Sequence, residues 1–207
     1  MQNFHIDESA NNYCRYICSF SLNPDSLSLW NYYTKTVSGT GYNIGFSWKS
    51  LIEKINVLNE FETIHGKVLY EKEEQTHILE YALIGYNSAY ISATSDTERV
   101  QVLDQLRRCF NILSVYLKHP AFADEEEVRI CITPKTNPTI PRKANYRESN
   151  GIFVPYITVH FFVDAVKRIT ISPINQKELS INGISNMILD LGYTDVSIQI
   201  SEIPLRY

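Results

Sequence analysis

The sequence lacks the features that several large classes of protein require. It has no apolar run near the ~20 residues that a membrane-spanning helix needs, and its polar residues 1–12 do not resemble a signal peptide. Its four cysteines include no Cys-x-x-Cys pair, so neither a zinc site nor a disulfide framework is indicated. We therefore expect a cytoplasmic protein with reduced thiols and no membrane partner.

The charge balance is not that of a nucleic-acid-binding protein. The chain has 19 Lys and Arg against 23 Asp and Glu, a formal net charge of −4. Surfaces that bind nucleic acids are rich in basic residues, because contacts to phosphates dominate their affinity. The 14 tyrosines are not accompanied by a stripe of Lys and Arg, so we interpret most of them as half-buried strand residues.

The motifs of the common catalytic classes are absent as well. There is no Gly-x-Ser-x-Gly elbow, and Gly39, Gly41 and Gly45 have neither the dinucleotide nor the Walker spacing. The five histidines show no His-Glu-x-x-His or similar spacing, so no metal-ligand set is predicted. We interpret His160, in an apolar strand, as a core or edge residue.

What the chain does contain is a mixed pattern of strands and helices. Its 207 residues, 44% apolar and 20% charged, fit one folded domain, and we expect a flexible lead at 1–12 followed by a single domain at 13–207. The apolar spacing predicts an α+β fold with a mixed or antiparallel sheet. Strands are predicted at 14–21, 42–46, 67–71, 127–132, 154–162, 168–172 and 195–201, and helices at 26–35, 47–60, 75–91, 95–117 and 176–191. A turn is expected at His65-Gly66, a capping box at Ser95-x-x-Glu98 opens the helix at 95–117, and Gly192 is expected to stop the last helix.

A long polar segment, residues 133–151, separates two of the predicted strands. It holds three prolines and four of the 19 basic residues. A loop of this length inside a compact domain is usually either functional or loose. If the chain acts by binding, we expect residues 134–150 to form its contact surface.

The stretch 118–133 is the most informative part of the chain. A basic pair and a Pro-marked turn lead into an acidic run, and apolar residues then alternate with Glu127, Arg129 and Cys131 along a strand. Glu127 and Arg129 therefore share one face of that strand. One interpretation makes Glu127 a catalytic carboxylate that orients a sugar hydroxyl or a nucleophile, with Arg129 holding a partner charge. The other makes them an ion pair at a solvated strand entry, worth under ~1 kcal/mol if exposed, and spacing alone favours this one.

Short sequence motifs along nearly the whole chain from Cys14 onward resemble the motifs of one protein family. The motifs are Ser19-Phe20-Ser21, Leu29-Trp30-Asn31-Tyr32-Tyr33, Gly41-Tyr42-Asn43-Ile44-Gly45-Phe46, Val68-Leu69-Tyr70, Lys118, Phe122, Glu125-x-Glu127-x-Arg129, Arg147…Gly151…Pro155-Tyr156, Ile171-Ser172-Pro173 and Gly192-Tyr193…Ser201-x-x-Pro204-x-Arg206. In this order and spacing they are similar to the mostly bacterial domain of unknown function 2971 family.

That family is in turn similar in layout to ADP-ribosyltransferases, especially DNA-modifying toxins in which a catalytic Glu precedes a short apolar strand. The resemblance implies NAD as a substrate rather than a tightly bound cofactor, and a role in toxin or phage-defence biology with nucleic acid as one acceptor. The residues implied are Glu127 as the catalytic carboxylate that stabilises an oxocarbenium-like transition state, Arg129 as its support, Ser19 and Ser21 lining the nicotinamide side, and Trp30 and Tyr33 packing near the ring.

The chain departs from the family pattern at its start. Members usually begin with some tens of residues that carry a His-Tyr-Thr/Ser word and a Ser…Asn-Asp-Pro word, and residues 1–12 contain neither. Two hypotheses follow. The chain is either an NAD-dependent transferase or a non-catalytic module of the same family that binds a ligand, a protein partner or a segment encoded upstream. The departure favours the module, and the Glu-x-Glu-x-Arg strand favours the transferase.

Overall fold

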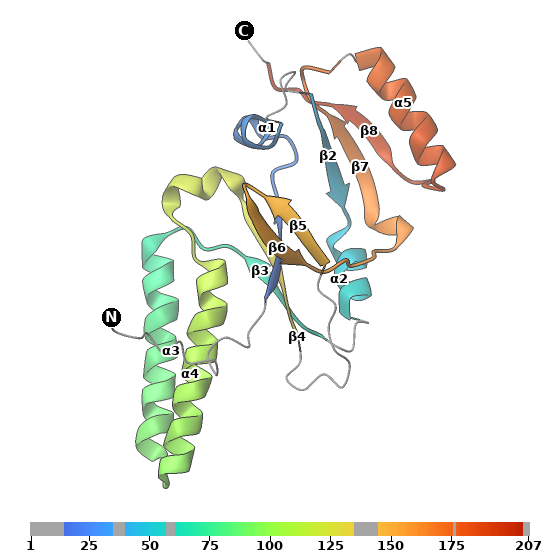
Figure 1. The fold of residues 1–207 in the computed structure, drawn as a ribbon. Helices are drawn as coiled ribbons and strands as arrows, with labels where there is room; N and C mark the ends of the chain where they lie inside the picture. The colour runs from blue at the N-terminus through green and yellow to red at the C-terminus, as the bar shows by residue number, and fades with distance from the viewer. Residues whose placement is uncertain (1–14, 35–39, 57–60, 135–144, 176, 205–207) are drawn as a thin grey trace. The chain divides into compact units, whose positions relative to one another are not determined.

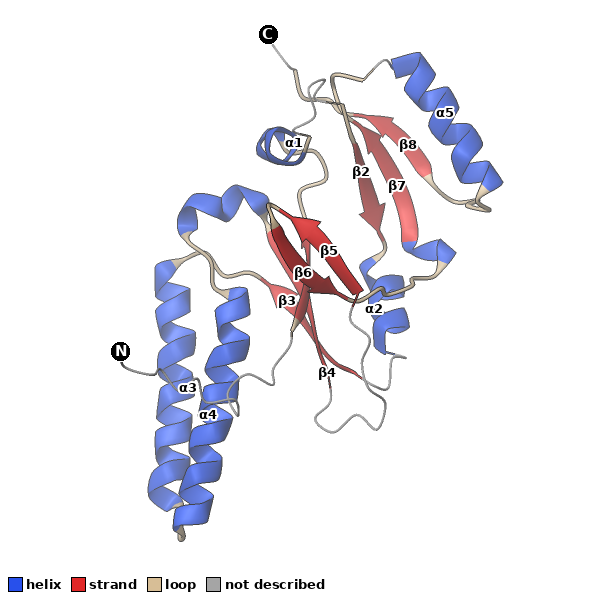
Figure 2. Ribbon diagram, in the orientation of Figure 1, coloured by secondary structure: helices blue, strands red, loops and turns tan. Residues whose placement is uncertain are grey.

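The structure is a computed structural model that describes residues 15–34, 40–56, 61–134, 145–175 and 177–204. Over these residues the chain forms five α-helices, two short 3₁₀-helices and eight strands (Figures 1 and 2). The predicted α+β class is therefore confirmed. The predicted flexible lead at 1–12 lies outside the described residues.

The elements occur in mixed order along the chain. The helices are α1 (Leu27–Tyr33), α2 (Trp48–Asn56), α3 (Lys72–Ser92), α4 (Asp96–Tyr116), η2 (Pro120–Glu125), η3 (Val163–Ala165) and α5 (Lys177–Asp190). The strands are β1 (Tyr16–Ser21), β2 (Tyr42–Phe46), β3 (Phe61–Lys67), β4 (Glu127–Pro134), β5 (Asn145–Ser149), β6 (Ile152–Tyr156), β7 (Val166–Ile171) and β8 (Ser197–Ile200). They pair in the orders β1-β4-β3, β2-β7-β8 and β5-β6.

The chain divides into two compact units. One comprises residues 1–18, 23–64 and 130–207, and the other comprises residues 19–22 and 65–129. The first unit holds the β2-β7-β8 sheet with α1, α2 and α5, and also the β5–β6 hairpin. The second holds the helix pair α3–α4 and the 3₁₀-helix η2.

In the first unit, α5 connects two parallel strands of one sheet. β7 pairs antiparallel with β2 and parallel with β8, and α5 lies in the crossover between β7 and β8, as parallel neighbours require. The helix packs Ile184 and Ile188 on Ile169 of β7. It ends in a Schellman motif, in which Gly192 has φ of +78° and the N–H of Tyr193 donates to the carbonyl of Ile188 at 2.8 Å. The helix stop expected at Gly192 is thus confirmed.

The carboxylate of Asp25 joins the start of α1 to the end of β8. Its Oδ1 accepts hydrogen bonds from Trp30 Nε1 and from Ser201 Oγ, both at 2.7 Å. Its Oδ2 accepts one from the backbone N–H of Glu202 at 2.9 Å. The buried indole of Trp30 is therefore fixed by a bond that a buried Trp needs for its N–H.

In the second unit, α3 and α4 form an antiparallel helix pair (Figure 1). The predicted capping box opens α4: Ser95 Oγ accepts from the N–H of Glu98 at 3.2 Å, while the Glu98 carboxylate accepts from the N–H of Thr94 at 2.6 Å. Among the described helices, none is both long and apolar enough to cross a membrane.

The sequence prediction placed three strands wrongly. The strand predicted at 154–162 ends at Tyr156, so His160 is exposed and lies outside any strand. The strand predicted at 67–71 lies instead at Phe61–Lys67, which includes the turn expected at His65-Gly66. Only Leu69 pairs beyond it, in an isolated bridge with Leu117. The segment 133–151 was predicted as a loop, yet Asn145–Ser149 is strand β5, paired with a β6 that begins at Ile152. Residues 57–60, predicted as the end of the second helix, and residues 135–144 of the predicted loop lie outside the described residues.

We expect Asp25→Ala to lower the free energy of unfolding by about 2–3 kcal/mol, because hydrogen bonds to a charged group each contribute about 1.5–3 kcal/mol and the indole N–H loses its acceptor. Chemical denaturation followed by tryptophan fluorescence measures the change. Asp190→Ala, at an exposed position at the end of α5, is the matched control and should leave the midpoint unchanged. Equal midpoints for the two variants would contradict the role given to Asp25.

Candidate functional site

Glu127 lies at the first position of β4, directly after the 3₁₀-helix η2. His119 caps η2, since its Nδ1 accepts from the N–H of Ala121 at 3.1 Å. The helix ends at Glu126, whose φ of 44° is left-handed and costs a non-glycine residue about 1–2 kcal/mol. This turn directs the side chains of Glu125 and Glu127 to the same ammonium group, as the distances below show.

Lys118 is the centre of a buried network of charges. Its Nζ lies 2.7 Å from Glu125 Oε2 and 3.5 Å from Glu127 Oε1. The other oxygen of Glu127 accepts from the guanidinium of Arg129. The side chains of Lys118 and Glu127 are only 21% and 8% exposed. Two carboxylates and two cations thus form a cluster with no formal net charge, as burial of charges requires.

Arg129 has a second acceptor on α4. Its guanidinium donates to the backbone carbonyl of Val115, in the last turn of that helix. Carbonyls there have no partner within the helix, so a cation satisfies them and stabilises the helix dipole. The expected ion pair between Glu127 and Arg129 is therefore present, and it lies in a buried cluster rather than at a solvated strand entry.

The backbone around Lys118 is held by Gln75 of α3. The Nε2 of Gln75 donates to the carbonyls of Leu69 at 2.8 Å and of Lys118 at 2.7 Å. The N–H of Lys118 in turn donates to the carbonyl of Leu69 at 3.1 Å. The hydroxyl of Tyr70 accepts from the N–H of Glu127 at 3.0 Å. These bonds fix the cation relative to both carboxylates.

The titration of Lys118 and Tyr70 reflects this environment. Burial alone lowers the pKa of Lys118, but the hydrogen bond to Glu125 and the nearby charge of Glu127 outweigh burial, so the pKa is raised above 10.5. Burial is the largest cause that raises the pKa of the Tyr70 phenol, although its hydrogen bond with the backbone of Glu127 acts in the opposite direction. Lys118 therefore stays charged at neutral pH.

The cluster leaves little room for Glu127 to act on a ligand. Each of its oxygens already faces a cation. A general base must be within hydrogen-bond reach of the proton that it takes, so a sugar hydroxyl would have to displace Lys118 or Arg129 first. What the arrangement does in the structure is hold η2, β4 and the end of α4 together.

The four residues expected at a nicotinamide ring are placed as follows. Ser19 is exposed and Ser21 half-buried, both on β1. Trp30 is a core residue of α1 that donates to Asp25, and Tyr33 is exposed at the end of the same helix. Within the described parts of the chain, no group of three or more His, Cys, Asp or Glu side chains is arranged to hold a metal ion.

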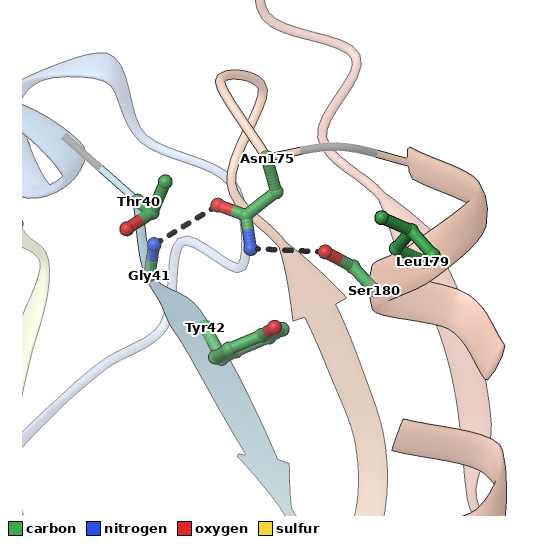
Figure 3. A pocket seen from close by; sticks show the side chains of 6 residues that line it. All are labelled: Thr40, Gly41, Tyr42, Asn175, Leu179 and Ser180. Carbon is green, nitrogen blue, oxygen red and sulfur yellow. Dashed lines mark hydrogen bonds between the residues drawn. The ribbon is translucent and has the colours of Figure 1, made fainter. Parts of the chain in front are cut away.

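A shallow pocket of about 500 Å³ lies in the first unit, at the start of α5 and β2. Figure 3 shows Asn175 between the two elements: its Oδ1 accepts from the N–H of Gly41 at 3.1 Å, and its Nδ2 donates to Ser180 Oγ at 3.4 Å. The exposed side chains of Tyr42 and Leu179 complete the lining. Because the polar groups bond one another, the pocket has an aromatic and an aliphatic wall and few free polar groups for a ligand.

Sequence reasoning assigned no role to Lys118, Tyr70, Gln75 or Asn175. Lys118 did appear among the motifs that resemble the family, and it precedes the acidic run by a turn marked with a proline. That spacing was the available signal for its contact with the carboxylates. The other three residues meet their partners through tertiary contacts, and no local spacing in the sequence indicates them.

We expect Lys118→Met to lower the free energy of unfolding by about 2–4 kcal/mol, because removing one partner of a buried pair leaves a buried charge without compensation. Urea denaturation measures the loss. Lys49→Met is the matched control, since Lys49 pairs with Glu53 at 3.9 Å on the surface, with both side chains largely exposed, and such pairs contribute little.

The same comparison made across pH tests the titration of Lys118. A pKa raised on folding gives stability that is complete below the unfolded pKa and is lost as pH rises through the folded one. The difference between the unsubstituted chain and Lys118→Met should thus stay constant from pH 7 to about 9 and shrink above about 10.5. A difference that already falls between pH 7 and 9 would show that the ammonium is not held by the two carboxylates.

No curated protein and no solved structure gives a significant match to the chain. Residues 29–130 match the model of one protein family, described as "Protein of unknown function (DUF2971)". The matched segment includes the whole Lys118 cluster and ends within β4, whereas Ser19, Ser21 and the β5–β6 hairpin lie outside it. The chain is therefore similar to this family over residues 29–130.

Proposed function

We propose that the chain is a non-catalytic protein-binding module, and that one face of the β5–β6 hairpin is its contact surface. The observation that carries the proposal is the exposure of the aromatic side chains on this face. The register pairs Tyr146 with Pro155 and Glu148 with Phe153, and residues directly opposite each other share a face. Tyr146 is 64% exposed and Phe153 is 79% exposed. Aromatic side chains left open in this way are typical of binding sites.

The backbone of the hairpin leaves one edge suited to pairing. Asn150 and Gly151 form the two-residue turn, and both have positive φ. The residue pair that flanks such a turn is hydrogen-bonded, and hydrogen-bonded and non-hydrogen-bonded pairs then alternate along the hairpin. At Tyr146 and Glu148 the peptide groups of β5 then point to its outer edge. On β6 the corresponding position is Pro155, which has no N–H to donate. A further strand can therefore pair with β5 more readily than with β6.

The occupant that fits is an extended segment of a partner protein that adds a strand to β5. A two-stranded hairpin is marginally stable alone, and a third strand stabilises it. On the exposed face, the neighbour of Tyr146 in the added strand should be apolar, whereas Phe153 of β6 lies one strand further away. The neighbour of Glu148 should be basic, because opposite charges across strands are favourable. The proposal thus specifies an extended segment with an apolar residue and a basic residue two positions apart, on the same side of the added strand.

The Lys118 cluster supports binding over NAD chemistry. An ADP-ribosyltransferase needs a carboxylate that can reach the substrate, whereas both oxygens of Glu127 contact cations. Trp30, the residue expected to pack near the ring, uses its indole N–H in the bond to Asp25. A stabilising role within the second unit accounts for Glu127 and Arg129 without any substrate.

Selection of short linear peptides from a displayed library against the full chain tests the contact surface. We expect the selected peptides to carry an apolar residue two positions from a Lys or Arg. Tyr146→Ala should weaken their binding about tenfold or more, and Phe153→Ala, one strand away, should weaken it less. Tyr33→Ala removes another exposed aromatic side chain and should bind as the unsubstituted chain does. Peptides that bind all three variants equally, or no enrichment at all, would overturn the proposed surface.

Calorimetric titration with NAD tests the transferase directly. We expect no heat of binding at millimolar NAD, because the carboxylate of Glu127 is held by two cations. Glu127→Gln and Trp30→Phe serve as the comparison variants. Circular dichroism should show that Glu127→Gln is folded. Saturable heat that disappears in this folded variant would favour the transferase and contradict the binding module.

A further inference from the structure

Helix α3 has apolar side chains on two opposite sides. Half-buried residues at Ile78, Ala82 and Tyr86 follow helical spacing and form one side, as expected for the side packed on α4. Tyr81, Ile84 and Ile91 also follow helical spacing. At 100° per residue, their positions lie about 150° from the first set. Tyr81 is 75% exposed and Ile91 is 71% exposed, and none of the residues of α3 is fully buried.

We propose that this second side, the outer stripe, packs antiparallel against the same stripe of a second copy of the chain. The outer stripe consists of His77, Tyr81, Ile84, Ser88 and Ile91. Helices in water bury such stripes because exposed apolar side chains are unfavourable there. The proposal rests on α3 alone and is independent of the function proposed for the β5–β6 hairpin.

The sizes of the side chains in the outer stripe complement one another only in the antiparallel arrangement. With Ile84 at the centre, His77 lies opposite Ile91 of the second copy. Tyr81 lies within one residue, about 1.5 Å along the axis, of Ser88 of the second copy. The largest residue thus meets the smallest, which is how facing helices fill space without voids. Gly85, beside the centre, has open space where a Cβ would be. In a parallel arrangement Tyr81 would lie opposite Tyr81.

The charges on α3 also favour the antiparallel arrangement. The acidic residues Glu73, Glu74 and Glu80 all lie in the first half of the helix, and residues 81–92 carry no charge. An antiparallel pair places the acidic half of each helix beside the uncharged half of the other, and it opposes the helix dipoles. A parallel pair would place like carboxylates side by side, which is unfavourable. The acidic half also disfavours an anionic membrane surface as the occupant.

Sedimentation equilibrium of the full chain tests the proposal. We expect the weight-average mass to rise with concentration from 23.9 kDa towards twice that value. Ile84→Glu places two carboxylates against each other at the centre and should keep the chain monomeric over the same range. Gln101→Glu adds the same charge at an exposed position of α4 and should dimerise as the unsubstituted chain does. A constant monomer mass for the unsubstituted chain would overturn the proposal.

Thiol crosslinking distinguishes the two orientations. In the antiparallel pair, position 84 lies next to itself, whereas the two copies of position 73 are about 33 Å apart. Ile84→Cys should therefore form a covalent dimer under mild oxidation and Glu73→Cys should not, each measured above the background of the native thiols in the unsubstituted chain. Crosslinking of both variants would show a parallel pair, and crosslinking of neither would show that α3 is not at the interface. Either result overturns the proposal.

Discussion

The shared ammonium of Lys118 is the interaction on which the second unit depends most. Two carboxylates that are nearly removed from water require compensating charges, and Lys118 and Arg129 supply them. This requirement explains local features that are otherwise unfavourable. The left-handed backbone at Glu126 brings Glu125 and Glu127 to one cation, and the bonds from Gln75 place that cation within reach. The strain at one residue is therefore offset by the charges that it brings together.

Much of the fold could be predicted because local pattern and tertiary environment agree. Strand β2 occupies the predicted residues 42–46, where apolar residues alternate between glycines. The capping box before α4 and the glycine after α5 were recognised from types of residue whose backbone bonds are local. Where pattern and environment disagree, the prediction was wrong. In β3 the apolar residues Phe61 and Ile64 are three positions apart and do not alternate, and Gly66 was taken as a turn. In the structure Gly66 is a strand position beside the ring of Tyr116.

The candidate site was predictable in part for the same reason. The pairing of Glu127 with Arg129 follows from two positions on one strand, and the structure contains it. The burial of that pair does not follow from the spacing, because it depends on where Lys118 and the last turn of α4 lie. The sequence pattern is the same for a solvated ion pair and for a buried one. Only the tertiary contacts distinguish a buried ion pair from a solvated one, and those contacts also decide whether a ligand can reach the carboxylate of Glu127.

Helix α3 shows why an exposed apolar surface can be missed in a sequence. A helix with one apolar side has a strong periodic signal, but two opposite apolar sides cancel in that signal. The segment around Tyr81 and Ile84 was accordingly predicted as a plain apolar helix. Strand β5 of the hairpin was missed because its residues are mostly polar and follow a segment rich in proline. Both surfaces belong to elements that contain no fully buried residue among those described. Substitutions on them should therefore change association while the core around Ile169 and the Lys118 cluster keep the chain folded, so binding and stability can be separated in this protein.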